Sequence, residues 1–113
     1  MTYRAVWNGA VLAESDDVVH LEGNVYFPIE SLNRDHVVES TSHTVCPWKG
    51  LASYYTVQVG DRVNPNAAWY YPHPSPLARK IRNRVAFWHG VRVERVGDDD
   101  REPAGGLRRW FSR

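Results

Sequence analysis

The sequence contains a single cysteine, Cys46, among its 113 residues. One thiol cannot form an internal disulfide bond, and it cannot supply the four-sulfur zinc site of many small domains. The sequence also lacks an apolar run approaching the roughly 20 residues that a membrane-spanning helix needs, and its first residues lack the apolar core of a signal peptide. We therefore expect a cytoplasmic protein without a transmembrane segment.

An excess of charge of either sign is also missing. The chain carries 14 Lys and Arg against 13 Asp and Glu, a formal net charge of +1. Such a balance produces no strong field to attract nucleic acid or a lipid surface, so neither is predicted as a partner. The five histidines show no paired metal-ligand spacing. No metal site is predicted and no cofactor is indicated.

Aromatic residues are abundant, with five tryptophans and six tyrosines. Apolar and polar residues alternate along several segments, and pairs of turn-forming residues separate these segments, a pattern typical of antiparallel hairpins. A chain of this length is expected to form one domain with one hydrophobic core. We predict a mainly β, sandwich-like domain over residues 1–96. The turn pairs are Asn8-Gly9, Gly23-Asn24 and Gly60-Asp61.

Two short helices are predicted between the strands. Pro28 is suited to the first turn of a helix through residues 29–32, because a proline there removes a donor that has no helical partner. Ser75 is a plausible N-cap of a second helix, with a proline directly after it. Leu77 and Ile81 are four residues apart, so we expect both on the buried face of this helix.

The last two strands are predicted at residues 85–88 and 91–96, paired across the two residues between them. The segments 6–13 and 87–94 resemble each other, since each places a tryptophan directly before a turn dipeptide. One hypothesis is that these terminal hairpins are adjacent in one sheet or packed face to face. A chance match between common hairpin signals is the alternative.

The composition changes after Val96. Residues 97–106 are polar and rich in aspartate and glycine, which predicts a linker rather than a strand. Residues 107–111 then mix aromatic and basic side chains. This tail either docks onto its own domain or anchors a partner, and the second reading describes an interaction protein.

The stretch Cys46-Pro47-Trp48-Lys49-Gly50 is the first candidate site. Proline holds the preceding residue in an extended conformation, and glycine lets the backbone bend or approach another group closely. Lys49 could stabilise a Cys46 thiolate or bind an anionic group, while Trp48 could stack on a ligand. The alternative is structural, with a buried cysteine, a tryptophan in the core and a lysine in water.

Cys46 is also the candidate nucleophile of a thiol-dependent enzyme, which would need a base within hydrogen-bonding reach. His43 is nearest in the sequence, but residues three apart in a strand point to opposite faces. His73 and His89 are the other histidines that could supply the base. Their positions relative to Cys46 cannot be derived from spacing.

A second aromatic cluster precedes the predicted second helix. Trp69 and Tyr71 would share one face of an extended segment. Together with Trp48 and Tyr54 they could wall a pocket for a compact ligand or peptide group, with Lys49 as an anion contact. Ordinary strand packing is the alternative. A binding domain with this pocket is the leading functional hypothesis.

Several ordered motifs resemble a known family. They are Cys46-Pro47-Trp48-Lys49-Gly50 with Ala52 and Tyr54-Tyr55, preceded by Glu22-Gly23-Asn24-Val25-Tyr26-Phe27-Pro28 and followed by Ala68-Trp69-Tyr70-Tyr71-Pro72. Over roughly residues 3 to 96 the chain resembles the bacterial domain-of-unknown-function family 427. The resemblance implies a compact β-tent or sandwich-like domain, related in shape to zinc-bearing ligand-binding modules.

The lone cysteine departs from the four-cysteine zinc site of those modules. The family has also carried a nucleotidyltransferase label. That chemistry needs carboxylates that hold a divalent metal and donors that hold a triphosphate. No glycine-rich phosphate loop precedes Lys49, and the acidic run 98–100 adjoins the predicted linker, so nucleotidyl transfer ranks below the other hypotheses.

Overall fold

A computed structural model describes residues 1–96 of the chain, and the predicted linker and tail at 97–113 lie outside the described residues. The described part is built from β-strands and short 3-10 helices. The strands are β1 (Thr2–Trp7), β2 (Ala10–Ser15), β3 (Val19–Leu21), β4 (Asn24–Pro28), β5 (Val37–Cys46), β6 (Gly50–Val59), β7 (Arg62–Tyr70), β8 (Arg84–Phe87) and β9 (Arg92–Val96). The 3-10 helices are η1 (Ile29–Ser31), η2 (Arg34–His36) and η3 (Pro76–Ile81).

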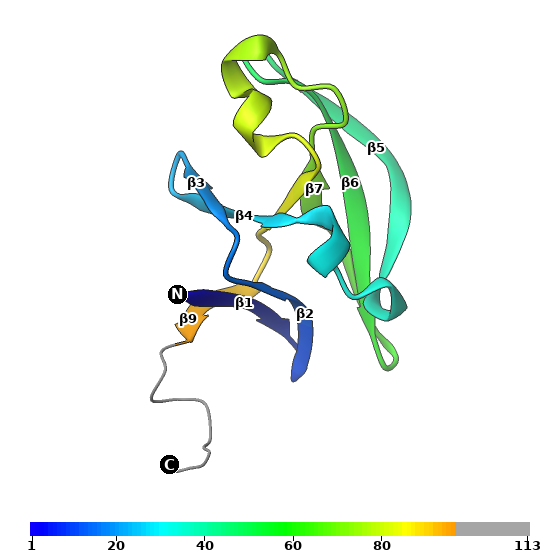
Figure 1. The fold of residues 1–113 in the computed structure, drawn as a ribbon. Helices are drawn as coiled ribbons and strands as arrows, with labels where there is room; N and C mark the ends of the chain where they lie inside the picture. The colour runs from blue at the N-terminus through cyan, green and yellow to red at the C-terminus, as the bar shows by residue number, and fades with distance from the viewer. Residues whose placement is uncertain (97–113) are drawn as a thin grey trace.

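The strands form two antiparallel sheets. The smaller sheet has the order β2-β1-β9, and the larger has the order β3-β4-β8-β7-β6-β5. In Figure 1 the smaller sheet lies below β4. Strands β5, β6 and β7 of the larger sheet run side by side to the right of β4. The mainly β fold expected from the sequence is confirmed.

The predicted hairpin turns form, one of them shifted by a residue. Asn8 and Gly9 adopt φ values of 50° and 78° between β1 and β2, the left-handed pair of a type I′ turn. The turn between β3 and β4 uses Glu22 and Gly23, with φ values of 53° and 79°, one position before the predicted pair. This shift places the Glu22 side chain on a turn.

The predicted hairpin between the last two strands is wrong. Strand β8 belongs to the larger sheet, whereas β9 pairs with β1 in the smaller one. The backbone N–H of Trp88 donates to the carbonyl of Ala67 at 3.0 Å, so the chain stays beside β7 until residue 88 and then turns toward the smaller sheet. The two segments that resemble each other are therefore not a pair of adjacent hairpins, because the second hairpin does not form. Only strand β9 lies beside β1.

The second predicted helix also differs from expectation. Leu77 is 80 % exposed, while Ala78 and Ile81 are fully buried. The backbone of η3 is kinked at Ala78, with φ −120° and ψ 21°, so the four-residue spacing of a regular α-helix does not place Leu77 and Ile81 on one face. Ser75 does occupy the N-cap position of η3, with Pro76 directly after it as predicted, but its side chain makes no capping hydrogen bond. Pro28 precedes η1 as its N-cap rather than lying in its first turn.

Alternation along the strands divides the core into two layers. Phe27, Tyr55 and Phe87 pack between the two sheets with residues of β1 and β2. Their sequence neighbours point to the opposite face of the larger sheet and pack beneath η3. Adjacent residues in a strand point to opposite faces, which accounts for this division. The second layer contains Tyr26, Ala52, Tyr54, Tyr71, Ala78, Ile81 and Ala86.

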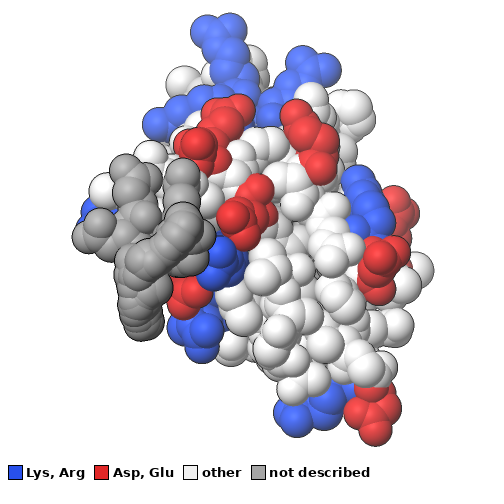
Figure 2. Space-filling view, turned by 60° about the horizontal axis from the view of Figure 1, so that its bottom comes forward, with Lys and Arg blue, Asp and Glu red and all other residues white. Residues whose placement is uncertain are grey.

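Charged side chains of both signs lie on the surface, beside an area without charged side chains in Figure 2. On the smaller sheet Arg4 of β1 lies between Glu14 of β2 and Glu94 of β9, with its Nε 3.0 Å from Glu14. Figure 2 shows basic and acidic side chains interspersed on the face that it presents. No helix within residues 1–96 is long and apolar enough to cross a membrane.

Candidate functional site

Neighbouring strands bring aromatic rings together on the η3 face of the larger sheet. Tyr54 of β6 is directly opposite Trp69 of β7, and Trp69 is opposite Ala86 of β8. The small side chain of Ala86 lets the Trp69 indole reach Tyr26 of β4, where Nε1 donates to the hydroxyl oxygen at 3.2 Å. The Tyr26 and Trp69 rings meet edge to face with centroids 6.2 Å apart.

A small open hollow of about 160 Å³ lies among these rings. Pockets for drug-sized ligands have volumes of about 300 to 1,000 Å³, so this hollow has room for one compact group. Its lining combines aromatic rings with an amide and an ammonium group. The lining residues are Asn24, Tyr26, Lys49, Tyr54, Trp69, Tyr71 and Trp88.

Trp88 forms the outer wall of the hollow. Its ring lies nearly parallel to that of Tyr54, with centroids 6.3 Å apart, and meets the edge of Trp69 at 5.4 Å. The indole Nε1 donates to the backbone carbonyl of Asn66 at 2.6 Å, and this hydrogen bond orients the ring although Trp88 is 45 % exposed. An exposed tryptophan held in this way presents a fixed aromatic surface to a ligand.

The loop that carries Lys49 is held by Ser75. The Ser75 backbone N–H donates to the carbonyl of Lys49 at 2.9 Å, and its hydroxyl donates to the carbonyl of Trp48. Gly50 has a φ of 115°, and a Cβ there would lie 3.3 Å from the backbone oxygen of His73. Glycine permits both this conformation and this close approach. Ser75 is the N-cap residue of η3 as predicted, and its side chain fixes the loop of the candidate site.

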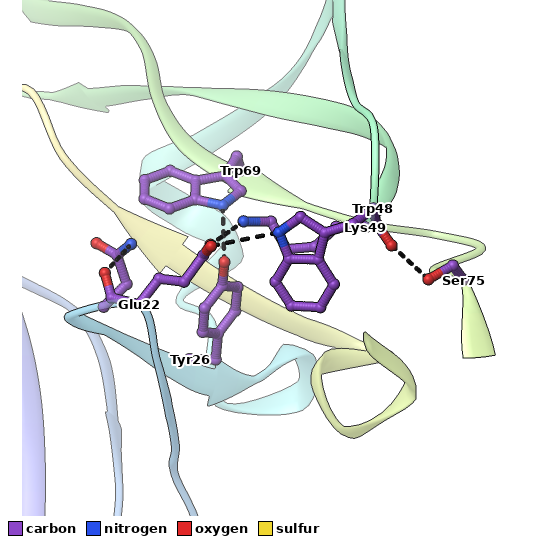
Figure 3. Close-up of polar contacts among 7 residues, drawn as sticks. Glu22, Tyr26, Trp48, Lys49, Trp69 and Ser75 are labelled. Carbon is purple, nitrogen blue, oxygen red and sulfur yellow. Dashed lines mark hydrogen bonds and ion pairs between the residues drawn. The ribbon is translucent and has the colours of Figure 1, made fainter. Parts of the chain in front are cut away.

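Lys49 is buried and forms an ion pair with Glu22. Its side chain is 10 % exposed, against 46 % for Glu22. The ammonium group also lies over the rings of Trp48 and Tyr71, 5.1 and 5.8 Å from their centroids. The Trp48 Nε1 donates to the same carboxylate at 3.3 Å. Figure 3 shows Glu22 reaching from its turn toward Lys49 and Trp48.

Protonation around Lys49 follows from these contacts. Burial opposes the charge on Lys49, but the hydrogen bond to Glu22 and the electrostatic contributions of Tyr71, Cys46 and Tyr26 together outweigh burial, so the pKa of Lys49 is raised. The same hydrogen bond lowers the pKa of Glu22. Burial raises the pKa of Tyr71 to about 12 and also raises the pKa of Tyr26. At neutral pH the site therefore contains an ion pair and uncharged tyrosine hydroxyls.

Cys46 is partly buried against the second core layer. Burial raises the pKa of the Cys46 thiol, but hydrogen bonds from the backbone of Trp48 and Lys49 and the charge of Lys49 together bring the pKa below its ordinary value. His43 is hydrogen-bonded to Ser53, with Nδ1 and Oγ 3.1 Å apart. The ring of His89 packs against Trp88. The loop thus stabilises the thiolate form of Cys46 relative to that of a free cysteine.

Four of the residues proposed from the sequence lie around the hollow: Lys49, Tyr54, Trp69 and Tyr71. Trp48 is not part of the lining and packs against Lys49 from outside. Trp69 and Tyr71 pack with the second core layer and Tyr70 with the first, as the alternation predicted.

The sequence reasoning missed four residues of the site: Glu22, Asn24, Tyr26 and Trp88. Alternation could have placed Tyr26 and Trp88, because each is one residue from a phenylalanine of the layer between the sheets. No local pattern pairs Glu22 with a lysine 27 positions away. That contact depends on how the β3–β4 turn lies over the larger sheet.

Comparison with known proteins identifies the family. Within residues 1–96 no three His, Cys, Asp or Glu side chains gather in a way that could hold a metal ion. No curated protein matches the sequence. A family model described as a domain of unknown function (DUF427) matches residues 1–99. The chain therefore belongs to the DUF427 family.

Proposed function

We propose that this chain is a binding domain whose hollow accepts one compact, flat ligand group. The observation that carries the proposal is the convergence of aromatic rings from β4, β6, β7 and the end of β8 around a buried ammonium group. Aromatic walls with a few polar groups are typical of small-molecule sites. In this proposal the rings of Trp69 and Trp88 contact the flat faces or edges of the ligand.

Lys49 is the polar contact in this proposal. An ammonium group has three N–H donors, and Glu22 and the flanking rings hold it in place without engaging all of them. A ligand acceptor atom could therefore be bound without breaking the ion pair. The loop is already tied down by Ser75, so little ordering would accompany binding.

We expect flat, single-ring compounds to perturb the indole N–H resonances of Trp69 and Trp88 in nitrogen-edited NMR titrations. Nicotinamide, nicotinate and 1-methylnicotinamide form a suitable set, because they share a ring and differ in charge. Trp69→Phe should weaken the tightest of them about two- to tenfold, since aromatic pairs contribute about 0.5 to 1.5 kcal/mol beyond area burial.

The matched control is Trp7→Phe, because Trp7 packs against the core between the sheets and faces Arg62 rather than the hollow. This variant should bind the ring compounds as the wild type does. Titrations in which none of the three compounds moves the Trp69 and Trp88 signals would overturn the binding proposal. Equal losses in both variants would count against a role for Trp69.

A second candidate function, thiol chemistry at Cys46, has one specific observation in its favour: the backbone hydrogen bonds from Trp48 and Lys49 that lower the thiol pKa. We expect alkylation by iodoacetamide to reach its half-maximal rate at a lower pH than for a free thiol. Lys49→Met should move this midpoint upward, because loss of the positive charge destabilises the thiolate. The rate measured as a function of pH checks both statements.

The control for this experiment is Lys80→Met, which removes an exposed lysine of η3 and should leave the midpoint unchanged. A midpoint at or above that of a free thiol would exclude an activated cysteine. Cys46 would then have only a structural role, packed against the second core layer.

A further inference from the structure

The charge of the buried Lys49 is balanced by the half-exposed carboxylate of Glu22. Among the seven residues that line the hollow, all within the described part of the chain, Lys49 alone has a formally charged side chain. Glu22 lies just outside this lining and pairs directly with the ammonium group. The hollow therefore has a charged donor whose net charge is already balanced.

The remaining polar groups offer both a donor and an acceptor to a ligand. The Tyr26 hydroxyl oxygen accepts from Trp69, which leaves its own proton to be donated. The Asn24 side-chain nitrogen points to the backbone carbonyl of Glu22 at 3.5 Å, which leaves Oδ1 as an acceptor. Lys49 and Tyr26 would thus face a ligand oxygen, and Asn24 would face a ligand N–H.

A neutralised lysine beside one hydroxyl donor and one amide acceptor disfavours charged ligands. A carboxylate near Lys49 would lie close to the Glu22 carboxylate, and like charges at short range repel. A cationic ring would meet the ammonium group of Lys49, which occupies the faces of Trp48 and Tyr71 itself. A neutral carboxamide or ring lactam avoids both conflicts and matches the donors and the acceptor.

Resting on the proposed function, we propose that the ligand is an uncharged flat ring with a carboxamide or lactam group, and that Glu22 is the residue that sets this preference. The ligand carbonyl accepts a hydrogen bond from Lys49, and its N–H donates to Asn24. Glu22 contributes by neutralising Lys49 and not by contacting the ligand, so it acts as a specificity-determining residue.

The experiment compares nicotinamide, nicotinate and 1-methylnicotinamide at neutral pH, each titrated into the wild type and into Glu22→Gln. We expect the wild type to bind nicotinamide at least about fivefold more tightly than either charged compound. In Glu22→Gln the unpaired Lys49 should raise the affinity for nicotinate about tenfold and change that for nicotinamide less than about threefold. Higher salt should reduce this increase in nicotinate affinity, because salt screens the attraction between the nicotinate carboxylate and the unpaired ammonium group of Lys49.

Glu30→Gln is the matched control, since it makes the same charge change at an exposed position on η1. It should leave all three affinities as in the wild type. Tighter binding of nicotinate or 1-methylnicotinamide than of nicotinamide by the wild type would overturn the inference while leaving the binding proposal intact. An unchanged preference in Glu22→Gln would overturn the role of Glu22. Absence of any response at Trp69 and Trp88 would overturn the proposed function itself.

Discussion

Replacement of Leu12 by alanine is expected to lower the free energy of unfolding by about 2 to 5 kcal/mol. Leu12 of β2 has no exposed surface and packs between the two sheets. Removing its buried methyl groups loses their transfer energy and leaves a cavity that the rigid sheets fill only in part. Since small domains have total stabilities of about 5 to 15 kcal/mol, this single change would remove a substantial part of the stability.

Leu77→Ala is the matched control, because it makes the same chemical change at a residue that is 80 % exposed. Its effect should stay within about 0.5 kcal/mol, as for most surface substitutions. Urea denaturation followed by tryptophan fluorescence measures both. Equal losses for the two variants would contradict the packing described here, since a regular helix with Leu77 on its buried face predicts a large loss at that position.

Replacement of Lys49 by methionine is expected to weaken nicotinamide binding about 10- to 100-fold. Hydrogen bonds to charged groups contribute about 1.5 to 3 kcal/mol, and each 1.4 kcal/mol corresponds to a factor of ten in affinity. Methionine keeps an unbranched side chain of similar size against Trp48 and Tyr71, so the packing is largely preserved. Glu22 is half exposed and can be solvated without its partner. NMR titration of the Trp69 and Trp88 signals measures the change in affinity.

Lys80→Met provides the comparison, since it removes a lysine that is exposed on η3. It should bind nicotinamide as the wild type does. Circular dichroism and the urea midpoint show whether Lys49→Met remains folded. A folded Lys49→Met protein with wild-type affinity would contradict the assignment of Lys49 as the polar contact.

The strands and most turns could be predicted from the sequence because their causes are local. Asn8 and Gly9 adopt left-handed conformations readily, so the first hairpin follows from two residues. Alternation alone likewise predicts that Trp69 and Tyr70 lie on opposite faces of the sheet, as they do. The second helix was mispredicted at Leu77, because a spacing of four residues identifies a buried face only in a regular α-helix, and η3 is a 3-10 segment that is kinked at Ala78.

The sequence by itself determined the β class of this protein, its first hairpins and the face on which Tyr54, Trp69 and Tyr71 lie. Only the tertiary structure decided that β9 pairs with β1, that Ser75 holds the Lys49 loop, and that Glu22 neutralises Lys49. Local patterns depend on the conformational preferences of neighbouring residues. Pairing across long stretches of chain depends on which sheet edges and turns meet after the strands have assembled, and no spacing within the sequence encodes that outcome.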